Sequence, residues 1–334
     1  MQRLHPKEAK ASKETGEQPH IIAMDIQQQP SVITCKAPRV DHLDGHGYLF
    51  GYPIAHSLSP IFHRTIFNSL GLNQDYQLLE STDMDQFLSL VRNPRCYGSG
   101  VTMPHKIAIM PFLDEMTPEC EAVGACNTIF KEGSTLIGTN TDIVGIRESF
   151  FQNVSDELWQ GRPGMVVGGG GAARSAVYAL ARYMQCEKIY LVNRDPTEVE
   201  AVMAWCQAHG YGDGLVHVAT IEQAEELEGP GAIVSCIPNF PPKTEAEFEA
   251  RRIVEYFLNK PRKGAMLEMC YHPSPWTEVG NLAEALGWEV VLGTEAMIYQ
   301  GFAQATCWTG RELCDLPVQR VKEVISKELR TSHL

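Results

Sequence analysis

Short apolar runs alternate along the chain with segments that repeat apolar residues every three or four positions. Met165–Val167 and Lys188–Val192 have the length and apolar character of buried strands, and Ala172–Tyr183 between them has the period of one helix face. Strands that alternate with helices predict an α/β fold with a mainly parallel sheet.

The same alternation occurs in the first half of the chain. Strands are predicted at Tyr48–Phe50, Tyr76–Leu79 and Gly100–Met103, and Thr128–Ile137 resembles a hairpin. One helix is predicted to start with Ser59 as its N-cap and Pro60 in its first turn, and another covers Asp83–Val91. Residues 1–40 lack periodicity and are predicted to be a flexible extension.

Composition excludes several classes of protein. The chain has 334 residues, which suits two domains, and its formal net charge of −13 argues against a nucleic-acid partner. No apolar run approaches the roughly 20 residues that a membrane span needs. The ten cysteines form no C-x-x-C pair, which favours reduced thiols and a cytoplasmic location. The 11 histidines predict no metal site.

A glycine-rich turn separates the strand at Met165–Val167 from the helix after it. Gly168, Gly170 and Ala173 fit the spacing G-x-G-x-x-G/A, in which glycine lets the backbone approach a diphosphate at a helix N-terminus. A flexible linker would also be rich in glycine. The second strand ends in Asn193-Arg194-Asp195, where a dinucleotide-binding unit reads the adenosine ribose.

Three polar stretches interrupt the first half. Ser57 and Ser59 suit a small carboxylate, although Ser59 alone is more simply explained as a helix cap. Lys106 follows a predicted strand and a proline, where its side chain could point into a cleft. Thr141 and Asp142 could interact with substrate or cap the helix that follows.

Seven motifs in a fixed order make the chain similar to a known family. They are GYPIAHSLSP, VTMPHK, AVGACNT, GTNTD, VVGGGGAARSA, MCYHPSPWTE and GTEAMIYQG, between about Gly47 and Arg311. The chain resembles the shikimate/quinate dehydrogenase family, and the fungal quinate dehydrogenases most closely.

The resemblance implies a two-domain α/β fold with a cleft between the domains. It implies a substrate-binding and catalytic domain at residues 41–150 and a Rossmann-type NAD(P)-binding domain at residues 151–294. Helices at residues 295–334 would return to the first domain. Reversible hydride transfer would convert a ring hydroxyl of quinate, and of shikimate as a second substrate, into a ketone.

The resemblance also assigns roles to single residues. Lys106 and Asp142 would act on the reacting hydroxyl. Substrate would be held by Ser57, Ser59, Thr102, Asn127, Tyr271 and Gln300. The cofactor would be held by Gly168, Gly169, Gly170, Gly171, Ala172, Asn193, Arg194 and Asp195.

A lysine can take the hydroxyl proton if its pKa is lowered by burial. Asp142 could orient Lys106, although an opposite charge would raise the lysine's pKa, and the sequence leaves open which effect is larger.

Two departures from the family pattern concern specificity. Gly100 stands where many members carry Asn, so it could leave space for the extra hydroxyl of quinate. Asp195 and Glu198 stand where NADP-dependent members carry Thr and a second Arg, which favours NAD because carboxylates repel a 2′-phosphate. Asp195 could instead serve only to start the next helix.

Two other functions compete with NAD-dependent quinate oxidation. One is a biosynthetic, NADP-dependent shikimate dehydrogenase, and the other is a ligand sensor of the quinate pathway without turnover. Retention of Lys106, Asp142 and the glycine turn disfavours the sensor, which needs no proton-transfer lysine. The predicted partner is a small molecule, and the pattern predicts no oligomeric state.

Overall fold

The computed structural model describes residues 32–272 and 274–331, so residues 1–31 of the predicted N-terminal extension lie outside the described residues. The chain that follows is tied to the loop before helix α2 (Met84–Val91). Ile33 N donates to Thr82 Oγ1 at 2.8 Å, and Ser81 Oγ donates to Ile33 O at 2.8 Å. Residues 33–35 therefore run beside the start of α2, where Gln86 also donates to Cys35 O.

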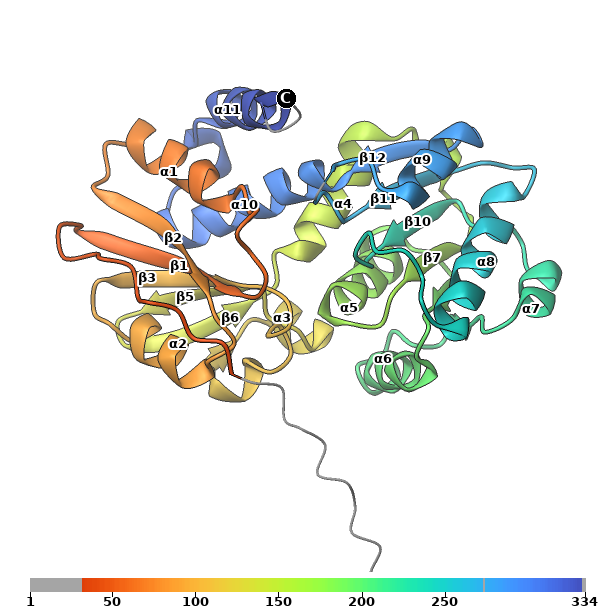
Figure 1. Ribbon diagram of the computed structural model, residues 1–334, viewed down its shortest axis with the longest axis horizontal. Coiled ribbons are helices and arrows are strands. Elements are labelled where there is room, and N and C mark those ends of the chain that lie inside the picture. Colours follow the sequence, from red (N-terminus) through yellow and green to blue (C-terminus); the bar gives the residue numbers. More distant parts are fainter. Residues whose placement is uncertain (1–31, 273, 332–334) are drawn as a thin grey trace, which may run out of the picture. The chain divides into compact units, whose positions relative to one another are not determined.

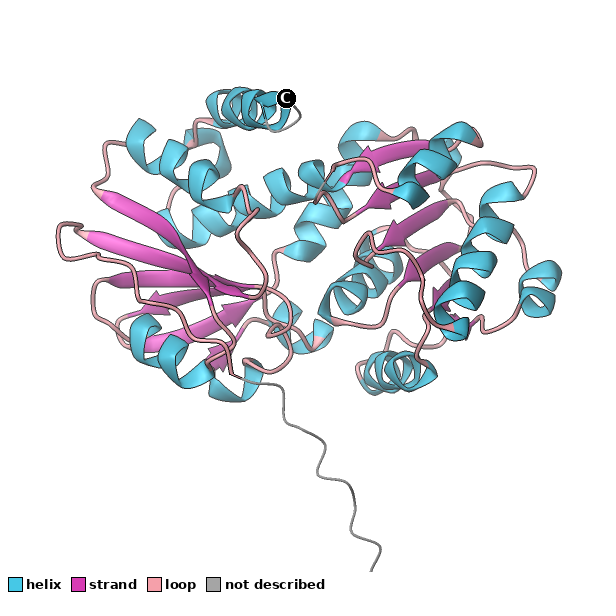
Figure 2. Cartoon of the chain, viewed as in Figure 1, coloured by secondary structure: helices cyan, strands magenta, loops and turns pink. Residues whose placement is uncertain are grey.

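The first sheet has the strand order β2-β1-β3-β5-β6-β4 (Figure 2). Its strands are β1 (Gly45–Gly51), β2 (Gln74–Glu80), β3 (Cys96–Val101), β4 (Glu115–Met116), β5 (Thr128–Glu132) and β6 (Thr135–Thr139). β1 pairs in parallel with β2 and β3, and β4 pairs in parallel with β6. The predicted hairpin, β5 and β6, is antiparallel and lies beside β3.

Helices from both ends of the described chain cover one side of this sheet. They are α1 (Ser59–Ser69) and α10 (Gly293–Thr309), and α11 (Val318–Thr331) packs outside them against α1 (Figure 1). Helices α2 and α3 (Pro118–Val123) cover the opposite side of the sheet. Phe62 and Ile66 of α1 are buried with Phe302 of α10 and Ile325 of α11 in one cluster. The predicted return of the C-terminal helices to the first sheet is thus confirmed, and apolar burial holds them there.

The second sheet is entirely parallel and has the order β12-β11-β10-β7-β8-β9. Its strands are β7 (Gly164–Val167), β8 (Ile189–Val192), β9 (Leu215–His217), β10 (Ala232–Ser235), β11 (Ala265–Glu268) and β12 (Glu289–Leu292). The helices of this half are α5 (Gly171–Tyr178), α6 (Pro196–Ala208), α7 (Ile221–Glu226), α8 (Glu245–Asn259) and α9 (Glu278–Ala285). This order is that of a doubly wound dinucleotide-binding sheet, which confirms the predicted fold class.

Alternate residues of the second sheet enter two separate cores. Val166 and Leu191 pack with Ala176 of α5 on one face, whereas Met165 and Tyr190 pack with Phe257 of α8 on the other. Because the chain leaves β7 and the adjacent β10 toward opposite faces, the carboxyl ends of these two strands form the switch point where ligands bind in such sheets.

One helix joins the two sheets. α4 (Asp142–Asn153) follows β6 of the first sheet and packs against both α10 and α5. Its buried residues Ile146 and Phe150 belong to the same core as Val166 of β7. The predicted domain boundaries at residues 40, 150 and 294 stay a prediction.

Three local predictions are wrong in detail. The N-cap of α1 is Leu58, not Ser59, which is the first helical residue. β3 spans Cys96–Val101 rather than Gly100–Met103, so the strand begins four residues earlier than predicted and ends before the turn at Met103. The helix predicted at Ala172–Tyr183 ends as α5 at Tyr178 and continues as one π-helical turn, Ala179–Tyr183.

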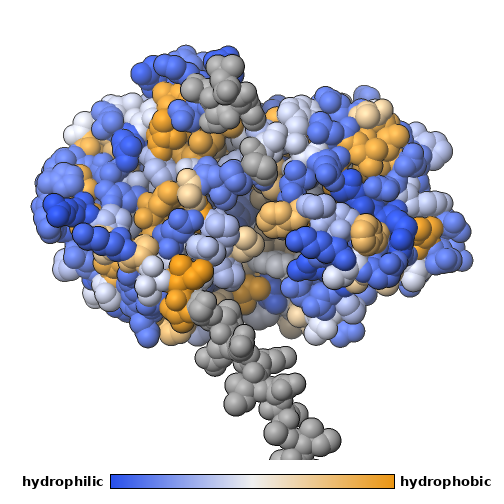
Figure 3. All heavy atoms as spheres, viewed as in Figure 1, coloured by the Kyte–Doolittle hydropathy of each residue, from blue (hydrophilic) through white to orange (hydrophobic). Residues whose placement is uncertain are grey.

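The described helices include none that is both long and apolar enough to cross a membrane. The face shown in Figure 3 is mainly polar, with its apolar residues in separate patches.

Candidate active site

Lys106 and Asp142 form a close ion pair. Lys106 lies in the turns that follow β3, and Asp142 is the first residue of α4. Lys106 Nζ donates to Asp142 Oδ2 at 2.5 Å, and the two side chains are only 16% and 8% exposed. The structure therefore brings together the two residues to which the sequence assigns the reacting hydroxyl.

Three further polar side chains complete what we call the lysine network, which consists of Lys106, Asp142, Asn127, Thr141 and Gln300. Asn127 Nδ2 donates to Asp142 Oδ1 at 2.9 Å and to Thr141 Oγ1 at 3.0 Å. Gln300 Oε1 accepts from Thr141 Oγ1 at 3.1 Å and from Asn127 Nδ2 at 3.3 Å. Both oxygens of Asp142 are therefore engaged, one by a cation and one by an amide.

Close packing of α4 and α10 brings Gln300 into this network. A Cβ built at Gly145 of α4 would lie 2.6 Å from the carbonyl oxygen of Ala296 and 3.1 Å from Gln300 Cβ. Glycine at this position is what allows the two helices to approach. Gln300 is 173 positions away from Asn127, so the contact depends on the return of α10 to the first sheet.

Two roles were predicted for Thr141, either contact with substrate or capping of the helix that follows it. It occupies the N-cap position of α4, but its hydroxyl makes no capping hydrogen bond. The hydroxyl bonds to Asn127 and Gln300 instead, and Thr141 N donates to Asn127 Oδ1 at 2.7 Å. Of the two alternatives for Thr141, the structure contradicts side-chain capping.

The predicted glycine turn links β7 to α5. Gly168 has a φ of +123°, which favours glycine, and its N–H donates to Val192 O of β8 at 2.9 Å. Gly170 is the N-cap of α5 and supplies no side-chain cap. No capping side chain therefore competes for the backbone N–H groups of Gly171 and Ala172 at the start of α5, as a diphosphate site requires.

This turn also touches the lysine network. A Cβ built at Gly171 would lie 3.0 Å from Lys106 Cβ and 3.5 Å from Ala125 Cβ. Asn140, just before Thr141, donates to Ser175 Oγ of α5 at 3.0 Å. The loops after β3, β6 and β7 therefore meet, although β7 belongs to a different sheet.

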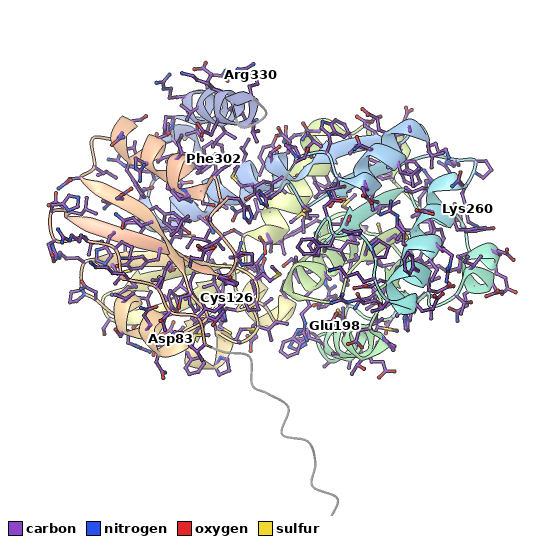
Figure 4. The ribbon with its side chains drawn as sticks, viewed as in Figure 1. Asp83, Cys126, Glu198, Lys260, Phe302 and Arg330 are labelled. Carbon is purple, nitrogen blue, oxygen red and sulfur yellow. The ribbon has the colours of Figure 1, made fainter. Side chains whose placement is uncertain are left out.

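The residues after β8 surround the middle of the glycine turn. Asn193 Nδ2 donates to Glu198 Oε2 at 2.7 Å, and a Cβ at Gly169 would lie 2.5 Å from Glu198 Cβ. Glu198 is labelled at the start of α6 in Figure 4. Asp195 caps α6, because its Oδ1 accepts from Thr197 N at 2.8 Å. Asp195 therefore starts the helix, as the alternative prediction had it. Its second carboxylate oxygen is left for other contacts.

Arg194 has a partner that the sequence reading missed. Its guanidinium pairs with Glu247 in the first turn of α8. The motif Thr244-x-x-Glu247 is a visible capping-box signal, and the structure contains that box. Its pairing with Arg194 has no local signal, since the two residues are 53 positions apart.

Ser57 and Tyr271 form a second polar group. Their side chains are neighbours, and Ser57 Oγ accepts from Ser59 N at 3.2 Å. The rings of His56 and His272, next to them in sequence, stack with centroids 3.9 Å apart. The loops after β1 and β11 therefore meet, and burial raises the pKa of Tyr271.

Some predicted site residues stay apart from the lysine network. Within the described part of the chain, no hydrogen bond joins the side chains of Ser57, Ser59 or Thr102 to Lys106 or Asp142. Thr102 follows β3 directly, and its N–H donates to Phe50 O of β1 at 2.9 Å. The ligand contacts predicted for these three residues stay predictions.

The expectation that Gly100 leaves space is wrong. A Cβ at this position would collide with the hydroxyl of Tyr76, and Gly100 N donates to Tyr76 Oη at 3.1 Å. Tyr76 is fully buried, and burial raises the pKa of its hydroxyl. The glycine accommodates a core side chain, so another feature must set the substrate preference.

A buried carboxylate lies near the switch point and was missed by the sequence reading. Glu268 ends β11, is 2% exposed, and accepts from Cys270 N at 3.1 Å and Thr277 Oγ1 at 2.9 Å. Burial raises the pKa of Glu268 to about 7. The carboxylate thereby holds both ends of the loop that carries Tyr271.

Cys236 lies close to charged residues at or beyond the ends of strands of both sheets. Cys236 directly follows β10, and a Cβ built at Gly168 would lie 3.4 Å from its Cβ. Burial raises the pKa of Cys236, and the charges of Glu268 and Lys106 also influence it. The switch point of the second sheet and the lysine network of the first are therefore neighbours.

Comparisons with known proteins agree with this geometry. Residues 49–129 match the family described as the shikimate dehydrogenase substrate binding domain. The quinate dehydrogenase of Emericella nidulans is 43% identical over 311 residues, which cover 86% of this chain and 94% of that protein. A pentafunctional AROM polypeptide of Komagataella phaffii is 35% identical over 268 residues, but this chain covers only 17% of its length.

A solved structure shows the same fold. The quinate dehydrogenase from Corynebacterium glutamicum, determined in complex with NAD, matches with a TM-score of 0.71. The match covers 85% of this chain and 99% of that one, at 22% identity.

Proposed function

Because the chain belongs to the shikimate/quinate dehydrogenase family of oxidoreductases, we propose that it is a quinate dehydrogenase that uses NAD and takes shikimate as a second substrate. The reaction would be the reversible oxidation of a ring hydroxyl to a ketone. The observation that carries the proposal is the buried pair of Lys106 and Asp142, placed directly against Gly171 at the start of α5.

The lysine network has the groups that proton transfer needs. In its neutral amine form, Lys106 Nζ would take the proton of the substrate hydroxyl as the carbon–oxygen double bond forms, and Asp142 would stabilise the resulting ammonium through the ion pair already described. A nicotinamide cofactor held at the glycine turn would supply the acceptor for the hydride that leaves the substrate carbon. Asn127 fixes the carboxylate through its second oxygen, so the pair is held before substrate arrives.

Substrate binding is proposed for the residues around this pair. Asn127 and Gln300 carry amide groups that can bond to ring hydroxyls, and both already belong to the network. Ser57 and Ser59 supply hydroxyls for the carboxylate, and Tyr271 lies beside Ser57. Thr102 would contribute a further hydroxyl from the end of β3.

The residues of the glycine turn fit a dinucleotide. The positive φ of Gly168 and the absence of a capping side chain at Gly170 favour the approach of a diphosphate to the amides of Gly171 and Ala172. Gly169 lies against Asn193 and Glu198, where an adenosine ribose would be read. The carboxylates of Asp195 and Glu198 disfavour a 2′-phosphate, which supports NAD over NADP.

A cytoplasmic location is part of the proposal. All ten cysteines are free thiols, including the buried Cys96, Cys120 and Cys206. Such a set of thiols suits a reducing compartment.

A two-by-two kinetic comparison tests the proposal. Quinate and shikimate are each combined with NAD and NADP, and reduced cofactor is followed by its absorbance. We expect the highest kcat/KM for quinate with NAD. A highest value for shikimate with NADP would instead identify a biosynthetic shikimate dehydrogenase, and no reduction with any pair would indicate a ligand sensor.

A further inference from the structure

An exposed ion pair spans the two halves of the second sheet at the proposed adenosine end. Arg194 follows β8, on one side of β7, whereas Glu247 lies in the first turn of α8, which follows β10 on the other side. The guanidinium of Arg194 pairs with Glu247 Oε1, and the side chains are 62% and 21% exposed. We call these two residues the arginine pair.

Glu247 is fixed before it meets the arginine. Its Oε2 accepts from the backbone N–H of Lys243 at 2.8 Å and of Thr244 at 2.9 Å. Thr244 Oγ1 in turn accepts from Glu247 N, which completes a capping box. The backbone N–H groups of Lys243 and Thr244, together with Arg194, lower the pKa of Glu247 to about 2. Glu247 is therefore a charged carboxylate throughout the neutral pH range.

The surroundings of Arg194 are otherwise acidic. Asp195 follows it in the chain and caps α6, and Glu198 bonds to Asn193 beside Gly169. Around the proposed ribose site, three carboxylates therefore accompany one guanidinium, and Glu247 engages that guanidinium.

We propose that Glu247 is a specificity-determining residue for the nucleotide: it binds Arg194 and so withholds from a 2′-phosphate the guanidinium that would attract it. The inference rests on the proposed dinucleotide function. It adds Glu247 of α8 to Asp195 and Glu198 as a carboxylate that disfavours NADP. It also implies that Arg194 is held away from the nucleotide, which its position in the motif does not predict.

The physical reason lies in the different charges of the two nucleotides. A 2′-phosphate needs a guanidinium or ammonium to offset its charge, and a guanidinium already held by a fixed carboxylate offers little net attraction. A free ribose diol is neutral and needs only hydrogen-bond acceptors, which Asp195 and Glu198 supply. Discrimination therefore comes from denying the wrong ligand a partner as much as from binding the right one.

The test substitution is Glu247→Gln. Glutamine also completes a capping box with threonine, so α8 keeps its start while the charge that holds Arg194 is removed. The matched control is Glu249→Gln, two residues further along α8, where the carboxylate pairs with Arg252 at 2.6 Å and not with Arg194. Both variants change the net charge by the same amount.

Dissociation constants of NAD and NADP, measured by calorimetry without substrate, are the readout. We expect Glu247→Gln to improve the binding of NADP relative to NAD by about tenfold, and Glu249→Gln to change the ratio by less than about twofold. Arg194→Ala alone should leave the ratio nearly unchanged, because the guanidinium is already engaged. The double variant Arg194→Ala/Glu247→Gln should lose most of the gain.

Two results would overturn the inference while leaving the proposed function intact. One is an unchanged ratio of the NADP and NAD dissociation constants in Glu247→Gln, provided that the unsubstituted protein binds NAD. The other is a gain that persists in the double variant, since removal of negative charge and not release of Arg194 would then explain it. Failure of the unsubstituted protein to bind either nucleotide would instead reject the proposed function and, with it, the inference.

Discussion

The lysine network and the arginine pair are both built on a cation and a carboxylate, yet they are held in opposite ways. Lys106 and Asp142 are 16% and 8% exposed, and the side-chain amide of Asn127 holds the carboxylate in place. Arg194 is 62% exposed, and its carboxylate is fixed by the backbone of its own helix. The first pair is positioned by packing, whereas the second depends on charge in contact with water.

The two pairs are therefore suited to different tasks. Inside the protein a charge pair is strong and costly to break, so it suits chemistry that needs fixed geometry. At the surface a pair contributes little to stability, and salt screens it. A surface pair suits selection between ligands that differ in charge, because its effect on affinity is small but has a definite sign.

Removal of the Lys106 side chain should give the largest effect of the substitutions considered. Lys106→Ala is expected to lower kcat by about 10²-fold or more, the usual scale for general acid–base catalysis. Steady-state kinetics with quinate and NAD measure it. The control is Lys188→Ala, which removes an exposed lysine just before β8 and should leave kcat unchanged. Near-normal turnover of Lys106→Ala would exclude a catalytic role for this residue.

Glu268, a buried carboxylate that has no cation within hydrogen-bonding distance among the described residues, should make the free energy of unfolding depend on pH. Glu268 has a folded-state pKa of about 7 against a reference of 4.5, so the folded state binds its proton more tightly. Its stabilising contribution is complete below pH 4.5 and is lost as the pH rises through about 7. Glu268→Gln should therefore gain about 2–3 kcal/mol relative to the unsubstituted protein between pH 5 and pH 8, at about 1.4 kcal/mol per pKa unit.

Urea unfolding of both proteins at the two pH values measures this difference. Unfolding free energies that change in parallel with pH would show that Glu268 titrates as an ordinary exposed carboxyl group.

Loss of the Ser57 hydroxyl should have a smaller effect, on binding alone. Ser57 Oγ accepts from the backbone N–H of Ser59, and its side chain has no hydrogen bond to Lys106. Ser57→Ala is expected to raise KM for quinate by about tenfold, the value of one hydrogen bond to a charged group, with kcat nearly unchanged. A fall in kcat as large as that of Lys106→Ala would place Ser57 in the chemical step.

Salt should produce the smallest effect and distinguish the two pairs directly. Raising ionic strength from about 0.05 M to 0.5 M shortens the screening length several-fold and should narrow the preference for NAD over NADP by about two- to threefold. The ratio of kcat/KM values at the two salt concentrations measures it. The kcat for quinate with NAD should change much less, because the lysine network is buried. An equal response of both quantities would contradict the distinction.

Much of the fold follows from periodicity and local signals. The strands at Tyr48–Phe50, Met165–Val167 and Lys188–Val192 lie within or overlap β1, β7 and β8. These segments are buried on both faces, and such strands have continuous apolar runs that sequence reveals directly. The Thr128–Ile137 hairpin was also recognisable, because two short apolar segments flank a glycine turn.

Where the local reading failed, a distant side chain decided the outcome. Gly100 was expected to leave space for substrate, but the hydroxyl of Tyr76 fills the volume beside it. Thr141 looks like a helix cap, but Asn127 and Gln300 offer its hydroxyl better partners. Neither competitor is within reach of a pattern that covers a few residues.

Neighbouring residues were enough to predict β1, β2, β7 and β8 and the positions of Lys106, Asp142 and the glycine turn, because local backbone preference and burial are encoded in them. Three other contacts depend on the folded arrangement: Gln300 with Asn127, Tyr76 with Gly100, and Glu247 with Arg194. These contacts join residues from 24 to 173 positions apart, and packing of whole elements, not any local preference, brings them within bonding distance.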